Sequence, residues 1–147
     1  MRKLLPPTSP QVWGPPTWES LHRLAAGYPD SPTPPVKRHC AAFLRAIPWM
    51  LPCESCGFHF MSFLENYEGG LELIVSCRPE LVRFLVEAHN DVSARTRPEE
   101  LPWTVHRAQE AYAAPVEVEN CEPYPLDWFG RSGLVRSVES RGCGCKQ

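Results

Sequence analysis

Proline and glycine divide this chain into segments in which apolar residues recur every three or four positions. That spacing places the apolar side chains on one face of an α-helix, and proline commonly opens a helix that glycine or a later proline closes. We find no alternation of apolar and polar residues long enough to indicate a strand. The sequence therefore predicts an all-α fold, a four-helix bundle with antiparallel neighbours and a short fifth helix. The expected helices span residues 13–29, 35–47, 53–70, 79–98 and 103–112.

The first and fourth of these segments have the clearest core faces. Because residues three or four positions apart lie on one side of a helix, each set should pack inward. The second helix should be interrupted or kinked by the prolines at its end. The predicted core faces consist of Trp18, Leu21, His22 and Ala25 in the first segment and of Leu81, Phe84, Leu85, Ala88 and Val92 in the fourth.

The length of 147 residues allows one compact domain with a core but not two domains of ordinary size. We expect an N-terminal arm over residues 1–12, a domain over 13–114 and a mobile or loosely docked C-terminal tail over 115–147, where prolines, glycines and charges replace the apolar pattern. The net charge of −2, with both signs mixed along the chain, argues against nucleic acid or an anionic membrane as a partner. The start, MRKLLPP, lacks the apolar stretch of a signal peptide, so we expect neither a secretion signal nor a membrane span.

The first chemically informative pattern is a C-x-x-C, formed by Cys53 and Cys56 at the expected start of the third helix. Unpaired N–H groups and the positive dipole end of a helix stabilise a thiolate there and lower a cysteine pKa from about 8.5 into a reactive range. One thiol can then attack while the other resolves the product. The alternative is half of a zinc site, completed by His59 or by Cys143 and Cys145. The C-x-C spacing of that second pair favours redox chemistry over zinc.

Four stretches, WGPPTWESLH, YPDSPT, LPCESCGFHF and HNDVSARTRP, resemble the Erv/ALR family of FAD-linked sulfhydryl oxidases in their order, over roughly residues 13 to 97. The resemblance implies a four-helix bundle with a short fifth helix that binds FAD near its end, usually as a homodimer. Such enzymes use oxygen to convert dithiols into disulfides and release hydrogen peroxide. We therefore expect an FAD-dependent thiol oxidase, with FAD as its cofactor and no metal, that acts on protein dithiols or on a thioredoxin-like carrier.

The resemblance also assigns roles to individual residues. Cys56 matches the flavin-proximal cysteine, and Cys53 matches the cysteine that meets the incoming electron donor. From the residues alone, rings on two helices beside a dithiol supply the stacking surfaces that a flavin requires. The same rings also fit an ordinary helical core, and the polar residues beside them also fit a solvated stripe. The expected cofactor-binding residues are Gly14, Thr17, Trp18, His22, Cys56, His89, Asn90, Val92, Ser93 and Arg97.

The chain departs from the family pattern at several positions. Members usually carry arginine, tryptophan and asparagine where Pro15, Phe84 and Ser93 stand. The family's usual structural disulfide is missing as well, because Val86 occupies the place of its first cysteine. These departures change individual cofactor contacts and leave the expected fold unchanged.

Three further cysteines have no role in this scheme. Cys40 lies on the apolar stripe of the second helix and is most simply a buried thiol. Cys77 and Cys121 either form a replacement bridge or each stay free. Three cysteines cannot all pair within one chain, so at least one of them is expected to be a free thiol.

The chain ends on RGCGCKQ, which places Cys143 and Cys145 in a second dithiol. A C-x-C disulfide closes a small strained ring, and strained, exposed disulfides are more oxidising, which suits a pair that accepts electrons from substrate thiols. Several members of the family carry such a pair as a shuttle. A flexible coil of the 29 residues from Ala114 to Cys143 has an r.m.s. span of roughly 30 Å. Electrons should then pass from substrate to the C-x-C, to the C-x-x-C at Cys53, to FAD and to oxygen.

Two other classes of protein stay open on this sequence. One is a zinc-stabilised, cysteine-rich binding module, and the other is a catalytically inactive Erv-like interaction protein. Without a signal peptide we expect a cytoplasmic protein, including the cytoplasm of a virus-infected host cell or a virion, with the mitochondrial intermembrane space as the alternative. Short members of the family without a signal occur in large cytoplasmic DNA viruses, and the missing structural disulfide leans toward such an origin.

Overall fold

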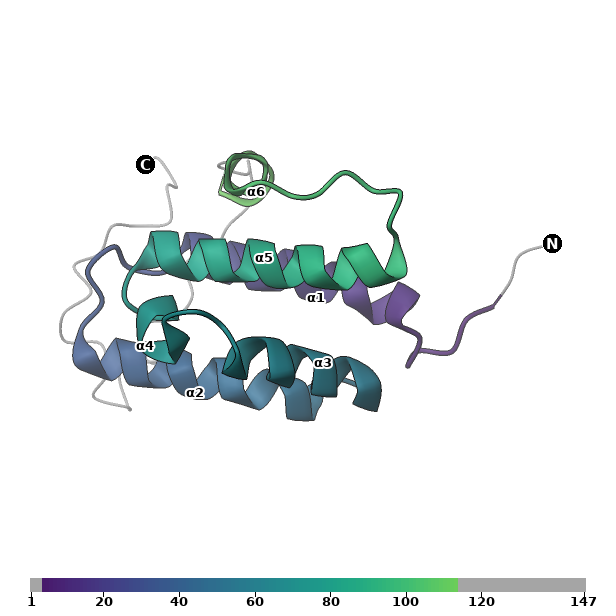
Figure 1. Ribbon diagram of the computed structural model, residues 1–147, viewed down its shortest axis with the longest axis horizontal. Coiled ribbons are helices and arrows are strands. Elements are labelled where there is room, and N and C mark those ends of the chain that lie inside the picture. The colour runs from purple at the N-terminus through teal and green to yellow at the C-terminus, as the bar shows by residue number, and fades with distance from the viewer. Residues whose placement is uncertain (1–3, 114–147) are drawn as a thin grey trace, which may run out of the picture. The chain divides into compact units, whose positions relative to one another are not determined.

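The computed structural model describes residues 4–113, and its helices form two layers. Figure 1 shows α1 and α5 side by side in one layer and α2 and α3 in the other, while α6 crosses the α1/α5 layer on its outer side. Helix α4 joins the layers because it contacts both α3 and α5. The predicted all-α bundle with a short extra helix is confirmed. The helices are α1 (Pro10–Ala26), α2 (Pro34–Met50), α3 (Glu54–Glu65), α4 (Gly70–Ile74), α5 (Arg78–Thr96) and α6 (Val105–Tyr112).

Helix α1 begins three residues earlier than the sequence predicted. Pro10 occupies its first turn, where a missing N–H costs little because that group has no partner within the helix. Pro15 and Pro16, which suggested the helix start, lie inside it. The indole Nε1 of Trp13 donates to the Thr8 carbonyl oxygen at 3.1 Å, which anchors this early turn to the preceding segment. The expected start was wrong because proline is tolerated here beyond the first helical position.

Helix α2 also extends past its predicted end. It runs through Pro48 to Met50, three residues beyond Ile47. Proline at position 48 removes the hydrogen bond that an N–H would make to the Leu44 carbonyl, but in the last turn only that one bond is lost. The helix therefore continues until Leu51, whose backbone is extended.

The segment after α3 contains a helix that periodicity did not indicate. Helix α3 ends at Glu65, and Gly69 and Gly70 adopt φ angles of 82° and 64°, in the left-handed region that glycine enters without steric cost. Helix α4 follows and has only five residues, too few to show a helical repeat in the sequence. The sequence predicted that the third helix runs to these glycines and stops there, which was wrong: α3 ends at Glu65 with Asn66 as its C-cap, and Gly69 and Gly70 start α4 instead.

The core lies between the two layers around Phe84 of α5, which is fully buried. The rings of Phe60, Phe63 and Tyr67 surround it at centroid distances of 6.1, 5.8 and 5.1 Å. Edge-to-face pairs of this kind each contribute about 0.5–1.5 kcal/mol beyond the area they bury. Two contacts are edge-on, those of Phe60 and Tyr67. This aromatic cluster therefore fixes α3 and its following loop against α5.

Arg78 at the start of α5 holds the loop between α1 and α2. Its Nε donates to the Tyr28 carbonyl oxygen at 2.6 Å, its backbone N donates to the Pro29 carbonyl at 3.1 Å, and its Nη2 pairs with Asp30 at 3.1 Å. The Tyr28 hydroxyl donates in turn to the Val75 carbonyl at 3.0 Å. These contacts connect the end of α1 to the start of α5 and keep the two helices in register.

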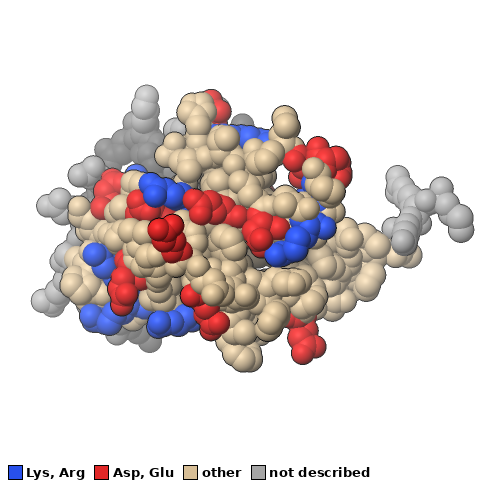
Figure 2. All heavy atoms as spheres, viewed as in Figure 1, with Lys and Arg blue, Asp and Glu red and all other residues tan. Residues whose placement is uncertain are grey.

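The outer surface carries both signs of charge. Figure 2 shows lysine and arginine interspersed with aspartate and glutamate on the face in view, with uncharged surface between them. None of the helices within residues 4–113 combines the length and apolar character that a membrane crossing requires.

Candidate functional site

Cys53 and Cys56 form a disulfide at the N-terminus of α3, with Cα atoms 5.2 Å apart. Cys53 is the N-cap residue, and its Sγ accepts a hydrogen bond from the Cys56 backbone N at 3.3 Å. The Ser55 hydroxyl lies 3.5 Å from the same sulfur. When the pair is reduced, these polar groups and the helix dipole favour the thiolate of Cys53. Both cysteines are half-buried, so a sulfur at this position can be reached from solvent.

A cluster of aromatic and imidazole rings lies between α1, α5 and the segment that leads into α6. The ring of His89 stacks on Trp18 at 4.4 Å with an interplanar angle of 6°. The ring of His22 stacks on Tyr112 at 4.9 Å, also at 6°. Trp103 lies 5.5 Å from both His89 and Tyr112. The structure thus brings together three of the predicted cofactor residues, Trp18, His22 and His89.

The two histidines of this cluster are buried and bonded to each other, with His22 Nε2 3.0 Å from His89 Nδ1. Burial lowers the pKa of His22 to about 4. Burial also lowers the pKa of His89 to about 4, assisted by the positive charge of His22, Arg97 and Arg107. At neutral pH both rings are therefore uncharged, and one nitrogen of the contact donates while the other accepts.

Asn90 uses its side chain to hold the main chain of Trp103. Its Nδ2 donates to the Trp103 carbonyl oxygen at 2.8 Å, and its Oδ1 accepts from the Trp103 backbone N at 2.7 Å. This two-way contact attaches the segment after α5 to that helix and positions the Trp103 ring beside His89. Asn90, expected from the sequence to bind cofactor, here positions a ring of the cluster.

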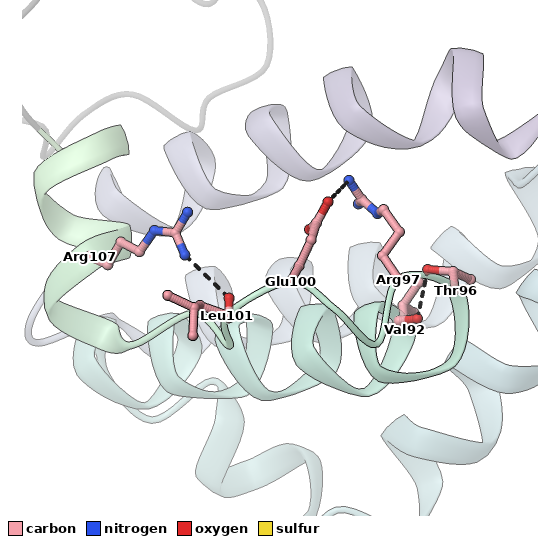
Figure 3. Close-up of polar contacts among 6 residues, drawn as sticks. All are labelled: Val92, Thr96, Arg97, Glu100, Leu101 and Arg107. Atoms are coloured by element: carbon pink, nitrogen blue, oxygen red, sulfur yellow. Dashed lines mark hydrogen bonds and ion pairs between the residues drawn. The ribbon is translucent and has the colours of Figure 1, made fainter.

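Two arginines lie next to the ring cluster. The guanidinium carbon of Arg107 lies 4.2 Å from the Trp103 ring centroid, and its Nη1 donates to the Leu101 carbonyl oxygen at 3.3 Å. Arg97, just after α5, pairs with Glu100 at 2.8 Å. Figure 3 shows both arginines above α5, on either side of the segment that carries Leu101 and Glu100. The charge of Arg107 therefore lies directly over a ring of the cluster, while that of Arg97 is paired with Glu100.

An apolar groove of about 410 Å³ runs between α1 and α2. Thr17 and Leu21 line its α1 side, and Phe43 and Met50 line its α2 side. Pro52, the residue before Cys53, lies at its edge. The groove therefore connects the side of α1 that carries Thr17 to the turn that carries the disulfide.

The remaining predicted cofactor residues occupy different settings. Gly14 is half-buried on α1, and a Cβ there would meet nothing within 4 Å. The Thr17 hydroxyl donates to the Trp13 carbonyl at 2.7 Å. Val92 is half-buried on α5, whereas Ser93 is buried and its hydroxyl has no hydrogen-bond partner among the described residues.

Sequence reasoning missed three residues of this site, Trp103, Arg107 and Tyr112. All three lie in the short helix predicted at 103–112, and the two aromatic residues at its ends are the signal that could have indicated them. Their position beside His22 and His89 depends on the contact between Asn90 and Trp103, thirteen residues apart, which no local pattern reveals.

The structure describes two of the other five cysteines, Cys40 and Cys77. Within residues 4–113, Cys40 and Cys77 form no disulfide, and both are half-buried. In the same range no three histidine, cysteine or carboxylate side chains converge as a metal site would require. Cys121, Cys143 and Cys145 lie outside the described residues, so the predicted bridge to Cys77 and the C-x-C shuttle stay predictions.

The chain matches the model of the Erv1 / Alr family over residues 15–113. It is 35% identical to 347L of Invertebrate iridescent virus 6, whose name describes an FAD-linked sulfhydryl oxidase, over 101 residues that cover 67% of this chain and 91% of the viral protein. It is 34% identical over 96 residues to the mitochondrial FAD-linked sulfhydryl oxidase ERV1 of Saccharomyces cerevisiae, covering 65% of this chain and 48% of that protein. The crystal structure of the yeast Erv1 core is similar with a TM-score of 0.64 and 28% identity, over 76% of this chain and 89% of that one. The chain therefore belongs to the Erv1 / Alr family.

Proposed function

We infer that this chain is an FAD-dependent sulfhydryl oxidase, which forms disulfides in protein thiols, uses oxygen as the final electron acceptor and releases hydrogen peroxide. The observation that carries this conclusion is the Cys53–Cys56 disulfide at a helix N-terminus, within a chain of the Erv1 / Alr family. The named sulfhydryl oxidases among its relatives support the same activity. Alternative roles without catalysis have no comparable support.

The described residues fit FAD as the cofactor. Stacked planar side chains offer surfaces for its rings, and the buried Ser93 hydroxyl, which has no partner, offers a polar contact. The apolar groove beside Pro52 offers walls for a flat ring system next to the disulfide. We propose that FAD is held by the residues predicted from the sequence and by Trp103 and Arg107. Arg97 and Arg107 would bind its phosphates.

In the reaction that we propose, a substrate thiolate attacks the Sγ of Cys53. The bond between Cys53 and Cys56 breaks, a mixed disulfide forms at Cys53, and Cys56 leaves as a thiolate. The second substrate thiolate then attacks the substrate sulfur of that mixed disulfide and releases Cys53. The substrate leaves with a disulfide, and the site keeps two electrons as a dithiol. FAD, when bound, supplies the two-electron acceptor that restores the Cys53–Cys56 disulfide and passes the electrons to oxygen.

Oxygen uptake tests this function. The purified chain should consume oxygen and release an equal amount of hydrogen peroxide when dithiothreitol is added. Cys53→Ser and Cys56→Ser should each remove the activity, because each breaks the exchange, while Cys40→Ser should leave it in place. Absence of dithiol-dependent oxygen uptake in the unmodified, FAD-loaded protein would overturn the proposal.

We propose that Cys143 and Cys145 form a second dithiol that passes electrons from protein substrates, or from a thioredoxin-like carrier, to Cys53. The length of chain after Ala114 and the strain of a C-x-C ring support this role. The double variant Cys143→Ala, Cys145→Ala should oxidise dithiothreitol at an unchanged rate and folded protein dithiols more slowly. Equal rates of the double variant and the unmodified protein on protein dithiols would remove the shuttle from the mechanism.

Two further proposals concern the whole protein. Residues 13–114 would form the oxidase domain, between an arm over 1–12 and the tail over 115–147 that carries the shuttle. A homodimer would form, as is usual in the family that the chain resembles. Light scattering of the purified chain should then give twice the monomer mass.

The compartment is also a proposal. The named relatives include viral and mitochondrial proteins. We propose the cytoplasm, including that of an infected cell or a virion, with the mitochondrial intermembrane space as the alternative. Cell fractionation with an antibody to the chain would distinguish these locations.

A further inference from the structure

Two large aromatic side chains next to the redox turn face solvent. Trp49, near the end of α2, has 82% of its surface exposed, and Phe58 on α3 has 62% exposed. Exposed apolar side chains of this size, close together, commonly mark a contact with another molecule. Neither of them lines the groove between α1 and α2, so both are separate from the surface that the cofactor proposal uses.

The packing of α2 against α3 places these two side chains on one side. Helix α3 touches α2 at Gly57, where an added Cβ would lie 2.4 Å from the Pro48 carbonyl oxygen. Trp49 follows Pro48, and Phe58 follows Gly57. The two helices run antiparallel, as Figure 1 shows. On each helix, the residue that follows the contact is therefore rotated toward the same side of the helix pair. The pair forms an aromatic rim, defined here as Trp49 and Phe58.

A polypeptide that reacts at Cys53 directly, without the second dithiol, has to bind beside this turn. Cys53 lies four residues after Trp49 and five before Phe58, and five helical residues advance about 7–8 Å along the axis. Disulfide exchange needs direct contact between sulfurs. An extended substrate spans about 3.4 Å per residue, so residues two or three positions from its cysteine reach about 7–10 Å to either side. Along the axis of α3 those residues cover the distance from Cys53 to Phe58. Around the axis Phe58 lies about 140° from Cys53, so a bound substrate follows the outer side of α3 to reach the rim.

We propose that the aromatic rim binds apolar side chains next to the cysteines of extended or unfolded protein substrates. The inference rests on the proposed oxidase function and names its preferred substrates: polypeptide dithiols whose cysteines are flanked by large apolar residues. Small dithiols do not reach the rim, so their oxidation is independent of it. Apolar cysteine neighbourhoods are accessible in a chain that has not yet folded, which is when a disulfide is needed.

Two synthetic peptides test this preference. Both contain two cysteines at the same spacing, flanked by leucine and phenylalanine in one and by serine and glutamine in the other. The host protein carries Cys143→Ala and Cys145→Ala, so that peptides react at Cys53 directly. The apolar peptide should show a kcat/KM about tenfold above that of the polar peptide, because burial of aromatic surface favours its transition state.

Trp49→Gln with Phe58→Gln should reduce that preference to less than about twofold and leave the rate on dithiothreitol unchanged. Leu101→Gln is the matched control, since Leu101 is 81% exposed and lies on the segment after α5. It should keep the preference. An unchanged preference in the rim variant overturns the inference, and a change in molecular mass without a change in preference assigns the rim to contact between copies instead. A protein that oxidises neither dithiothreitol nor peptide refutes the oxidase function itself.

A competition measurement tests the rim without altering it. The apolar peptide with both cysteines replaced by serine cannot exchange disulfides but keeps its apolar side chains. It should inhibit oxidation of the apolar dithiol peptide competitively, by raising KM, and should not affect the oxidation of dithiothreitol. Failure to inhibit at concentrations well above the KM of the dithiol peptide would contradict binding at the rim.

Discussion

At the scale of single residues, the histidine pair determines how the ring cluster responds to pH. His22 and His89 are buried, neutral and bonded to each other at 3.0 Å. Their pKa values are lowered from 6.5 to about 4. Above pH 6.5 such a histidine is neutral in both the folded and the unfolded chain, so it does not make stability depend on pH. As pH falls from 6.5 toward about 4, the unfolded chain binds protons that the folded chain does not, so the folded state loses stability.

The free energy of unfolding should therefore fall between pH 6.5 and 4, by on the order of 3 kcal/mol for each histidine. Urea unfolding at several pH values measures this slope. His89→Gln should flatten it, since one of the two groups no longer titrates. His39→Gln is the control, because His39 is exposed and its loss should leave the slope as it was. Identical slopes for all three proteins would contradict a buried neutral pair.

Asn90 provides a second test at this scale. Asn90→Ala should remove both hydrogen bonds to Trp103 and destabilise the protein by about 2 kcal/mol, at roughly 1 kcal/mol per bond. It should also weaken FAD binding, because the Trp103 ring is no longer held beside His89. Asn66→Ala is the control, since Asn66 is exposed and its side chain makes one bond, to the Ser62 carbonyl. Thermal unfolding measures the loss of stability, and the fluorescence of released FAD measures the loss of binding. An Asn90→Ala protein with unchanged stability and unchanged FAD binding would exclude a role of Asn90 in positioning Trp103.

At the scale of helices, the contact of α3 with α2 determines where the disulfide lies. A methyl group at Gly57 would come within 2.4 Å of the Pro48 carbonyl oxygen, and backbone cannot move aside as a side chain can. Gly57→Ala should therefore push the start of α3 away from α2 and destabilise the fold by about 1–3 kcal/mol. The matched control is Gly27→Ala, where a Cβ has 3.6 Å of room and φ is −84°.

The same variant should change the redox chemistry, because Gly57 adjoins Cys56. We expect a shifted equilibrium of the Cys53–Cys56 pair in glutathione buffers, measured by thiol alkylation, while Gly27→Ala keeps the value of the unmodified protein. Loss of stability with an unchanged redox equilibrium would limit the role of Gly57 to packing.

Most helices could be predicted from the sequence, because their apolar residues repeat over three or more turns. Leu21, His22 and Ala25 are buried on one face of α1 as predicted, and Leu81, Phe84, Leu85 and Ala88 are buried on α5. The errors fall where a local rule was overridden. Prolines inside α1 and α2 were read as boundaries, and α4 is too short to repeat.

The site was predictable in part, for a physical reason. Trp18, His22 and His89 belong to stretches that resemble the family, and the structure brings them together. Trp103 and Tyr112 join them only through contacts between residues that are distant in sequence. No local pattern encodes that Asn90 reaches the main chain of Trp103. The exposure of Trp49 and Phe58 is likewise a result of how α2 and α3 pack.

At the scale of the whole molecule, the fold divides the work between its two layers. The layer of α2 and α3 presents the disulfide at the turn between them, and the layer of α1 and α5 carries the stacked rings and, with the segment that follows, the arginines. The groove between α1 and α2 reaches from one layer to the other and ends at Pro52. A bundle of this kind can hold a flat cofactor between a dithiol and a set of rings.

An FAD-linked sulfhydryl oxidase holds a coloured cofactor that its dithiol reduces, so the visible absorption spectrum of the purified protein tests the proposed function. The protein should be yellow, with about one FAD per chain, and dithiothreitol added without oxygen should bleach the colour until air restores it. Cys56→Ser should keep the colour and lose the bleaching. A colourless protein that contains stoichiometric zinc, or a yellow one that dithiols do not bleach, would contradict the account.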